Sequence, residues 1–298
     1  MIFLISLLAV TPFKADRVEI LNQSGERIVY LLGNVEIEQE KTIIQCLEAQ
    51  LNETRGYVFL KDNVFIKDEN GEIKANSAIY FFDKKFSVLT GDVKLISENE
   101  IISADSLEYE GEKRIVRMFK NVMLEDTKNK VISHGEEGFY DLNAEIGSLK
   151  KEPRIKISRA DKMPITILAR EFLLKNKENL CFGYDSVVVF IDSITIYCDT
   201  LSYDFKKETG CMTRPSIFEK NNELRGIDGE FGLSNKNIDY FKVSSGIASY
   251  WTNDGAHNII EGESINILFQ EGRAFRIKVE GNPKGKLYLK EQKENAGD

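Results

Sequence analysis

The sequence predicts an all-β protein built from bent antiparallel strands. Three observations lead to this fold class. Short steps of the type Gly-Asp-Val recur every 29 residues, apolar and polar residues alternate in two runs of each repeat, and polar turn signals separate the runs. A fixed period of this size is typical of a repeat architecture. Eight repeats of two runs predict about sixteen strands.

An apolar residue marks the same position in each repeat. Val35, Val64, Val93 and Val122 follow one another at intervals of 29 residues. Looser copies continue the series at intervals of 30 to 33 residues, at Ile155, Val187, Ile217 and Ile247. The repeat therefore covers most of the chain.

The first run of each repeat leads through this position. Leu89, Gly91, Val93 and Leu95 lie two residues apart, as they would on one face of a half-buried strand. Residues that tolerate unusual backbone angles stand just before the marked positions, namely Gly33, Asn63, Gly91 and Asn121. We therefore expect the first run to bend at this point.

The second run carries one irregularity in its alternation. Ile102 and Ala104 are two residues apart, and so are Leu107 and Tyr109, but the step between the two pairs is three. One extra residue between two same-face pairs predicts a bulge or bend that keeps the apolar side inward. A weaker copy of the pattern places on one face Ile132, His134, Glu137 and Phe139. Strands that all bend at one height fold the sheet into two walls, which enclose a V-shaped trough.

The junctions between the runs predict chain reversals. Asp68–Glu72 contains Asn-Gly, the strongest short hairpin signal, and the other junctions are polar. Reversals at both ends of a run favour antiparallel hairpins. The alternative fold is a parallel β-helix, because a period of 29 residues also fits one of its rungs.

The four cysteines distinguish these two folds. In a hairpin array one strand lies between Cys181 and Cys211, which places them about 9 to 10 Å apart, too far for a disulfide. In a β-helix the two residues stack and can form a bond. Cys46 and Cys198 hold the small position before the step of three, so we expect both to be buried.

Composition and the ends of the chain suggest an exported protein. The 298 residues carry a formal net charge of −8, which argues against nucleic acid as a partner. The uncharged run from Ile2 to Phe13 is too short to span a bilayer and fits the apolar core of a secretory signal. Residues 1–15 are therefore a predicted signal peptide, and residues 291–298 a charged tail.

No pattern in the sequence predicts catalysis or a cofactor. The two histidines, His134 and His257, lie in different repeats without a framework of Cys or Asp around them. No phosphate-binding loop, nucleophile elbow or zinc-protease motif occurs. We therefore predict a protein that is not an enzyme and that holds no metal.

One repeat carries a family resemblance. The segment "LTGDVKLISENEIISADSLEYE" (Leu89–Glu110) resembles the repeat unit of the OstA/LptA family of lipopolysaccharide-transport proteins. The resemblance is specific over residues 29–125 and extends over about residues 16–290. It departs from the family pattern at His134-Gly135, at Pro153-Arg154 and from Asn221 onward. Residues 16–150 are thus expected to form a domain of this family, with residues 151–290 its continuation or a second, related domain.

The resemblance implies a fold, a ligand and a location. The fold is a β-jellyroll of folded antiparallel strands, and its trough holds lipid A acyl chains in the periplasm, with association with either membrane possible. The trough residues expected from the pattern are Val35, Ile37, Val64, Ile66, Leu89, Val93, Leu95, Ile102, Leu107, Tyr109, Val122, Leu124, Leu201 and Tyr203. Expected partners are lipopolysaccharide or a related glycolipid, transport proteins of the same fold that pair through edge strands, and further copies of the chain stacked head to tail.

Other functions stay open at this point. A β-helix would bind or cleave polysaccharide, and a purely structural solenoid would polymerise in the envelope. The apolar faces of the two walls can also simply close on each other as a sandwich core. Lipid binding separates the carrier from the structural alternatives.

Overall fold

A computed structural model describes residues 12–39, 41–68, 71–160, 162–252 and 255–288 of the chain. The chain forms two compact units, unit 1 (Met1–Ile155) and unit 2 (Lys156–Asp298). The predicted tail 291–298 and most of the predicted signal peptide 1–15 lie outside the described residues. Within that peptide, Phe13–Lys14 forms a short strand.

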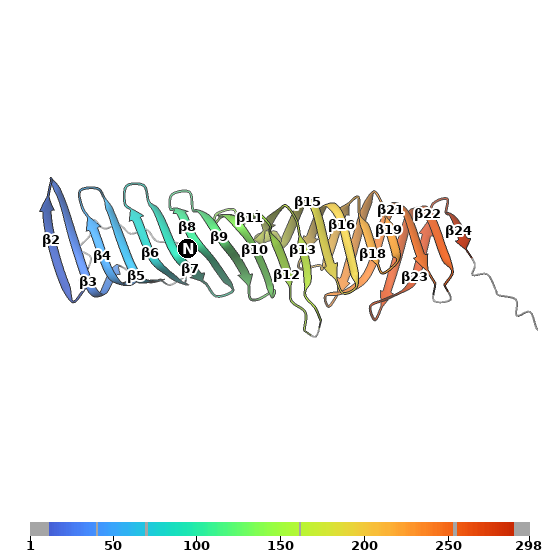
Figure 1. The fold of residues 1–298 in the computed structure, drawn as a ribbon, viewed down its shortest axis with the longest axis horizontal. Helices are drawn as coiled ribbons and strands as arrows, with labels where there is room; N and C mark the ends of the chain where they lie inside the picture. The colour runs from blue at the N-terminus through green and yellow to red at the C-terminus, as the bar shows by residue number, and fades with distance from the viewer. Residues whose placement is uncertain (1–11, 40, 69–70, 161, 253–254, 289–298) are drawn as a thin grey trace, which may run out of the picture. The chain divides into compact units, whose positions relative to one another are not determined.

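Unit 1 consists of antiparallel strands that follow one another in chain order (Figure 1). Its strands are β1 (Phe13–Lys14), β2 (Arg17–Gln23), β3 (Glu26–Gln39), β4 (Thr42–Asn52), β5 (Tyr57–Asp68), β6 (Gly71–Phe81), β7 (Phe86–Ile96), β8 (Glu100–Glu110), β9 (Ile115–Asp126), β10 (Val131–Asp141) and β11 (Ile146–Lys150). Strand β12 (Arg154–Ile157) crosses the boundary between the units.

Unit 2 has the same antiparallel organisation. Its strands are β13 (Ile165–Leu168), β14 (Glu171–Lys175), β15 (Leu180–Ile191), β16 (Ile194–Asp204), β17 (Thr209–Thr213), β18 (Ser216–Glu219), β19 (Asn222–Arg225), β20 (Asp228–Ser234), β21 (Asn237–Trp251), β22 (His257–Gln270), β23 (Arg273–Glu280) and β24 (Lys284–Tyr288). A single 3-10 turn, η1 (Asn176–Glu178), joins β14 to β15.

The predicted runs correspond to these strands. Some runs form one long strand, and others form two short strands on either side of a bend, as in β11 with β12 and β17 with β18. The sequence predicted about sixteen strands. The structure has one further bent strand at each end of this series, formed by β1 with β2 and by β23 with β24. The antiparallel pairing confirms the all-β hairpin fold, and the parallel β-helix alternative was wrong.

The bends lie where the sequence predicts them. The register between β7 and β8 shifts between Thr90 and Val93, and equivalent shifts occur in the neighbouring pairs of strands. Two consecutive residues with positive φ make the corner of β7, Gly91 at 79° and Asp92 at 49°. Equivalent pairs in other first runs are Gly33 and Asn34, Asp62 and Asn63, Lys120 and Asn121, Lys151 and Glu152, and Asp185 and Ser186. The predicted Gly and Asn positions are therefore confirmed as the points where the backbone turns.

Side chains of the second runs reach over these corners. Asp105, in the step of three of β8, accepts hydrogen bonds from Nδ2 of Asn121 at 3.0 and 3.1 Å. Asp16 likewise accepts one from Nδ2 of Asn34 at 3.0 Å, and its backbone N–H donates to the carbonyl of Gly33 at 2.9 Å. The irregular step thus places an aspartate where its carboxylate binds the side chain of an asparagine at the corner of the next strand.

One predicted face was wrong by one residue. In β10 the inward residues are Val131, Ser133, Gly135, Gly138 and Tyr140, in place of Ile132, His134, Glu137 and Phe139. The reason is the neighbouring strand β9, on which Val122 and the fully buried Met118 lie opposite Gly135 and Gly138. A Cβ on Gly138 would lie 2.8 Å from the terminal methyl of Met118 and 3.1 Å from a methyl of Val122, so Gly138 packs directly against these two side chains.

The last marked position was also wrong. Ile247 is 49% exposed, and its neighbour Ala248 is buried instead. This strand turns at a single residue of positive φ, Ser245, rather than at a pair. After this corner the buried residues are Gly246 and Ala248, so the marked position is offset by one residue.

The cysteines are free thiols in this fold. Cys46, Cys181 and Cys198 are buried, and Cys211 is exposed. Strand β16 lies between Cys181 of β15 and Cys211 of β17, because it pairs with both strands. Burial raises the pKa of Cys46 to about 11 and that of Cys198 to about 12.

Candidate functional site

The inner face of unit 1 has two walls that meet at the corners. The first wall comprises Phe86–Thr90 of β7 and the segments paired beside it, and the second wall comprises Val93–Ile96 and the segments paired beside it. On each strand the apolar residues before and after the corner lie on the same side of the sheet. The two walls therefore present facing apolar surfaces.

A row of valines lines the base of these walls. Val35, Val64, Val93 and Val122 are exposed by 2% or less. Each valine lies opposite a small residue of the next strand, in the pairs Val35 with Cys46, Val64 with Ala75, Val93 with Ala104 and Val122 with Gly135. Pairing one branched side chain with one small side chain lets the walls approach closely at the corner.

A cavity of about 40 Å³ lies between the walls, above the corner. Leu60, Leu89 and Leu107 line it from the first wall, and Ile66, Ile73 and Leu95 line it from the second. Because β5, β6, β7 and β8 all contribute residues, the cavity runs across several strands. This space admits only groups of about the size of water, so side chains fill most of the interior in this conformation.

Two tyrosines and a serine line the part of the cavity that is farther from the corner. Ser87 lies directly between Tyr80 and Tyr109 in the cross-strand register, and all three residues line the cavity. Burial raises the pKa of both tyrosines. The short side chain of Ser87 leaves a gap between two large rings, which is one reason that the interior is not completely filled there.

The predicted trough residues fall into three groups. Most of them are buried on the inner faces, and Ile37, Ile102 and Leu124 are half-buried toward the outer ends of the second wall. The cavity brings together five of them, namely Ile66, Leu89, Leu95, Leu107 and Tyr109. Leu201 and Tyr203 belong to unit 2 and line its interior instead.

Several lining residues were not among the predicted site residues. Leu60, Ile73, Ala78 and Tyr80 share the inward alternation of their strands, so the sequence pattern already contains the signal for them. Ser87 is polar at an inward position, and only the register against Tyr80 and Tyr109 reveals its place.

The inner face of unit 2 is tightly packed in its first strands. Phe172, Val187, Val189 and Ile196 are completely buried. Tyr203 stacks on Phe231 with ring centroids 6.0 Å apart, and burial raises the pKa of Tyr203. Farther along unit 2 a cavity of about 70 Å³ lies between Ile217 and Leu224 of one wall and Phe241 and Phe269 of the other. The face predicted from the alternation is thus filled in one part of unit 2 and leaves a small cavity in another.

Neither histidine lies in a cluster of potential metal ligands. His134 is half-buried on β10, and His257 stacks between Trp251 and Tyr288 while its Nε2 lies 2.8 Å from Oγ of Ser249. Within the described ranges, no group of three or more His, Cys, Asp or Glu side chains is placed to hold a metal ion. In the same ranges, no helix has the length and apolar character needed to cross a membrane.

The first part of the chain is similar to a known protein family. Residues 13–111 match the family described as "LptA/(LptD N-terminal domain) LPS transport protein". This part of the chain is similar to that family. The LptA-like match begins at the first residue of β1 and ends one residue after β8, so it contains the strands that line the cavity of unit 1.

One solved structure similar to this chain is LptH, "the LptA homologous periplasmic component of the conserved lipopolysaccharide transport device from Pseudomonas aeruginosa". It is 17% identical to this chain, and the alignment covers 37% of this chain and 81% of LptH with a TM-score of 0.33. No curated protein matches the chain.

Proposed function

We propose that the protein is a non-enzymatic carrier that binds lipopolysaccharide during its export to the outer membrane. The lipid A acyl chains lie between the two walls of unit 1, and the protein works in the periplasm. The observation that carries this proposal is that two features occur in the same strands. The apolar cavity between the walls is lined by β5 to β8, and the same strands fall within the match to a lipopolysaccharide-transport family.

Apolar burial supplies the binding energy in this proposal. Each methylene group that leaves water contributes about 0.8 kcal/mol, so even a short stretch of acyl chain gives useful affinity. Strands β5 to β8 offer similar apolar surfaces at each repeat, so an acyl chain moves from one repeat to the next without a single deep minimum. A cavity of about 40 Å³ does not hold an acyl chain, so the walls of unit 1 must separate when lipid enters.

Partner proteins are proposed to dock at the edges of the sheets. Among the described residues, β2 pairs only with β3, and its apolar residues Val18, Ile20 and Leu21 are exposed. An edge strand with free backbone groups can add to the sheet of a neighbouring protein. Transport proteins of the same fold, or a second copy of the chain stacked head to tail, fit this mode of pairing.

A photo-crosslinking residue at position 95 tests the carrier. Leu95 is 5% exposed and lines the cavity, whereas its neighbour Lys94 is exposed on the opposite face of β7. The carrier proposal expects a crosslinker in place of Leu95 to capture lipopolysaccharide and one in place of Lys94 to capture none. Equal capture at the two positions would contradict a bound lipid between the walls.

Substitution by aspartate separates the carrier from a closed sandwich core. If the walls open, the carboxylate of Leu95→Asp stays hydrated, so lipid capture falls while much of the fold remains. If the walls stay closed, the same change loses about 1.5–3 kcal/mol of leucine burial and adds the cost of an unpaired buried carboxylate, so the protein unfolds. The near-filled interior of unit 1 is the observation that favours the closed core as the second candidate. Lys94→Asp is the matched control, because it places the same charge on the exposed face.

A further inference from the structure

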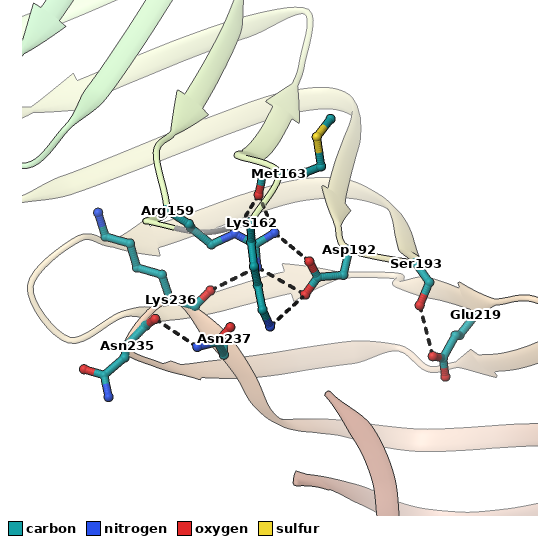
Figure 2. Close-up of polar contacts among 9 residues, drawn as sticks. All are labelled: Arg159, Lys162, Met163, Asp192, Ser193, Glu219, Asn235, Lys236 and Asn237. Carbon is teal, nitrogen blue, oxygen red and sulfur yellow. Dashed lines mark hydrogen bonds and ion pairs between the residues drawn. The ribbon is translucent and has the colours of Figure 1, made fainter. Parts of the chain in front are cut away.

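Unit 2 contains a buried arginine that joins separate parts of its fold. Arg159 lies in the connection between β12 and β13, and its side chain is only 4% exposed. Its Nη2 donates to Oδ1 of Asp192 at 2.7 Å, and its Nη1 donates to Oδ2 of the same carboxylate at 3.1 Å. Nε donates to the carbonyl of Met163 at 2.7 Å, which holds the connection itself in place (Figure 2).

A second set of bonds leads to a distant turn. Nη1 of Arg159 also donates to the carbonyl of Lys236 at 3.4 Å, and Nζ of Lys236 donates to the carbonyl of Ser158 at 3.1 Å. These residues are 77 and 78 positions apart in the sequence. Figure 2 shows Arg159 between the turn that carries Asp192 and the turn that carries Lys236.

The two turns belong to different walls of unit 2. Asp192 connects β15 to β16 at the end of the wall formed by Val187–Ile191 and its paired segments. Lys236 connects β20 to β21 at the end of the wall formed by Leu180–Tyr184 and its paired segments, where its backbone N–H donates to Oε2 of Glu208 at 3.0 Å. Both turns lie at the ends of the strands that are farthest from the corner. Arg159 therefore ties the open rims of the two walls together.

We propose that Arg159 is a latch that keeps the interior of unit 2 closed. Bonds between a guanidinium and a carboxylate are charge-assisted, and the two-point geometry fixes their direction. Because the guanidinium is buried, loss of Asp192 or of the turn at Lys236 leaves charged or polar groups without partners. Any apolar ligand, such as an acyl chain, enters the interior of unit 2 only after the latch opens.

The reactivity of the cysteines toward a thiol reagent shows directly whether the latch is open. Cys181 is 1% exposed on the inner face of β15, so a thiol reagent reaches it only when the interior of unit 2 opens. Cys46 is buried at a corner of unit 1 and serves as an internal control. Cys211 is exposed and shows that the reagent is active. This readout does not depend on lipid binding, so it stands or falls separately from the carrier proposal.

The experiment measures the alkylation rate of each cysteine by mass spectrometry in the folded full-length protein. Arg159→Ala should raise the rate at Cys181 by at least about tenfold, which corresponds to about 1.4 kcal/mol, and leave the rate at Cys46 unchanged. Arg214→Ala is the matched control. It removes an arginine that pairs with Asp199 on the exposed outer side of the corner, so it should change neither rate.

Asp192→Asn provides a second, milder variant in case Arg159→Ala does not fold. It keeps the shape of the side chain but removes its charge, so the rate at Cys181 should rise in the same direction. An unchanged rate at Cys181 in a folded latch variant would overturn the proposal. Equal increases at Cys181 and Cys46 would also overturn it, because they would mean that Arg159 only supports overall stability.

Discussion

The corner of β7 offers a sharp test of how the two walls are built. Gly91 has a φ of +79°, which lies in the left-handed region. A Cβ on this residue would lie 2.5 Å from Nδ2 of Asn76 and 2.7 Å from its Cβ. Gly91→Ala therefore combines an unfavourable backbone conformation with a steric clash.

The two contributions have separate magnitudes. A left-handed conformation costs a residue with a Cβ about 1–2 kcal/mol relative to glycine. Crowding in a packed site costs typically about 1–3 kcal/mol more. Gly25 isolates the first contribution, because it has a φ of +80° and no atom within 4 Å of the position of an added Cβ. Gly25→Ala should thus cost about 1–2 kcal/mol, and Gly91→Ala about 2–5 kcal/mol.

Urea unfolding of the full-length protein, followed by circular dichroism, measures both free energies. In the Asn76→Gly background the clash is removed, so Gly91→Ala should cost no more than Gly25→Ala does in the wild type. The reasoning fails if Gly91→Ala and Gly25→Ala have the same cost in the wild type. It also fails if the Asn76→Gly background does not reduce the cost of Gly91→Ala.

Two further predictions follow from the polar and sulfur groups of unit 2. Mass mapping of the oxidised protein should find no bond between Cys181 and Cys211, because β16 lies between them; a linked pair would contradict the strand order. Arg159 lowers the folded-state pKa of Asp192, so their pair stabilises unit 2 fully above about pH 4, the ordinary range for Asp, and this contribution is lost as the pH falls through the lowered pKa. The urea midpoints of the wild type and Asp192→Asn should therefore differ by a constant amount above about pH 4 and converge as the pH falls below it, whereas a difference that stays constant at lower pH would disprove the linkage.

Local sequence rules predicted the corners because they depend on a few residues in each strand. Gly91 and Asn121 tolerate positive φ, and the step of three between Ala104 and Leu107 marks the extra residue of a bend. These signals are contained within one strand and require no knowledge of its neighbours. The hairpin order followed from turn residues in the same way.

The errors arose where a neighbouring strand decides the outcome. In β10 both faces carry large apolar residues, among them Ile132 and Tyr140, so alternation alone does not reveal which face is buried. Gly135 and Gly138 lie opposite the buried Val122 and Met118 of β9, so their face is the inner one. The gap at Ser87 depends on two tyrosines of other strands in the same way.

Nothing in the sequence pattern predicts the contacts that Arg159 makes in the latch. Arg159 and Lys236 are 77 residues apart, and both stand in polar connections that look like ordinary solvated turns. Only the folding of the two walls brings these turns together. The closed interior of unit 2 therefore could not be distinguished from the interior of unit 1 by alternation, because both have the same inward pattern.

The repeated corner also sets the steps in which the length of each unit can change. Neighbouring strands lie about 4.8 Å apart, so every repeat of two strands lengthens a sheet by about 9.6 Å. Because each corner is satisfied by the strand beside it, as Asp105 satisfies Asn121, a whole repeat can be duplicated or deleted without altering the cross-section. A single inserted residue within a strand would instead reverse every side chain beyond it. The length of such a protein can therefore change during evolution in steps of one repeat, while the width of its interior stays constant.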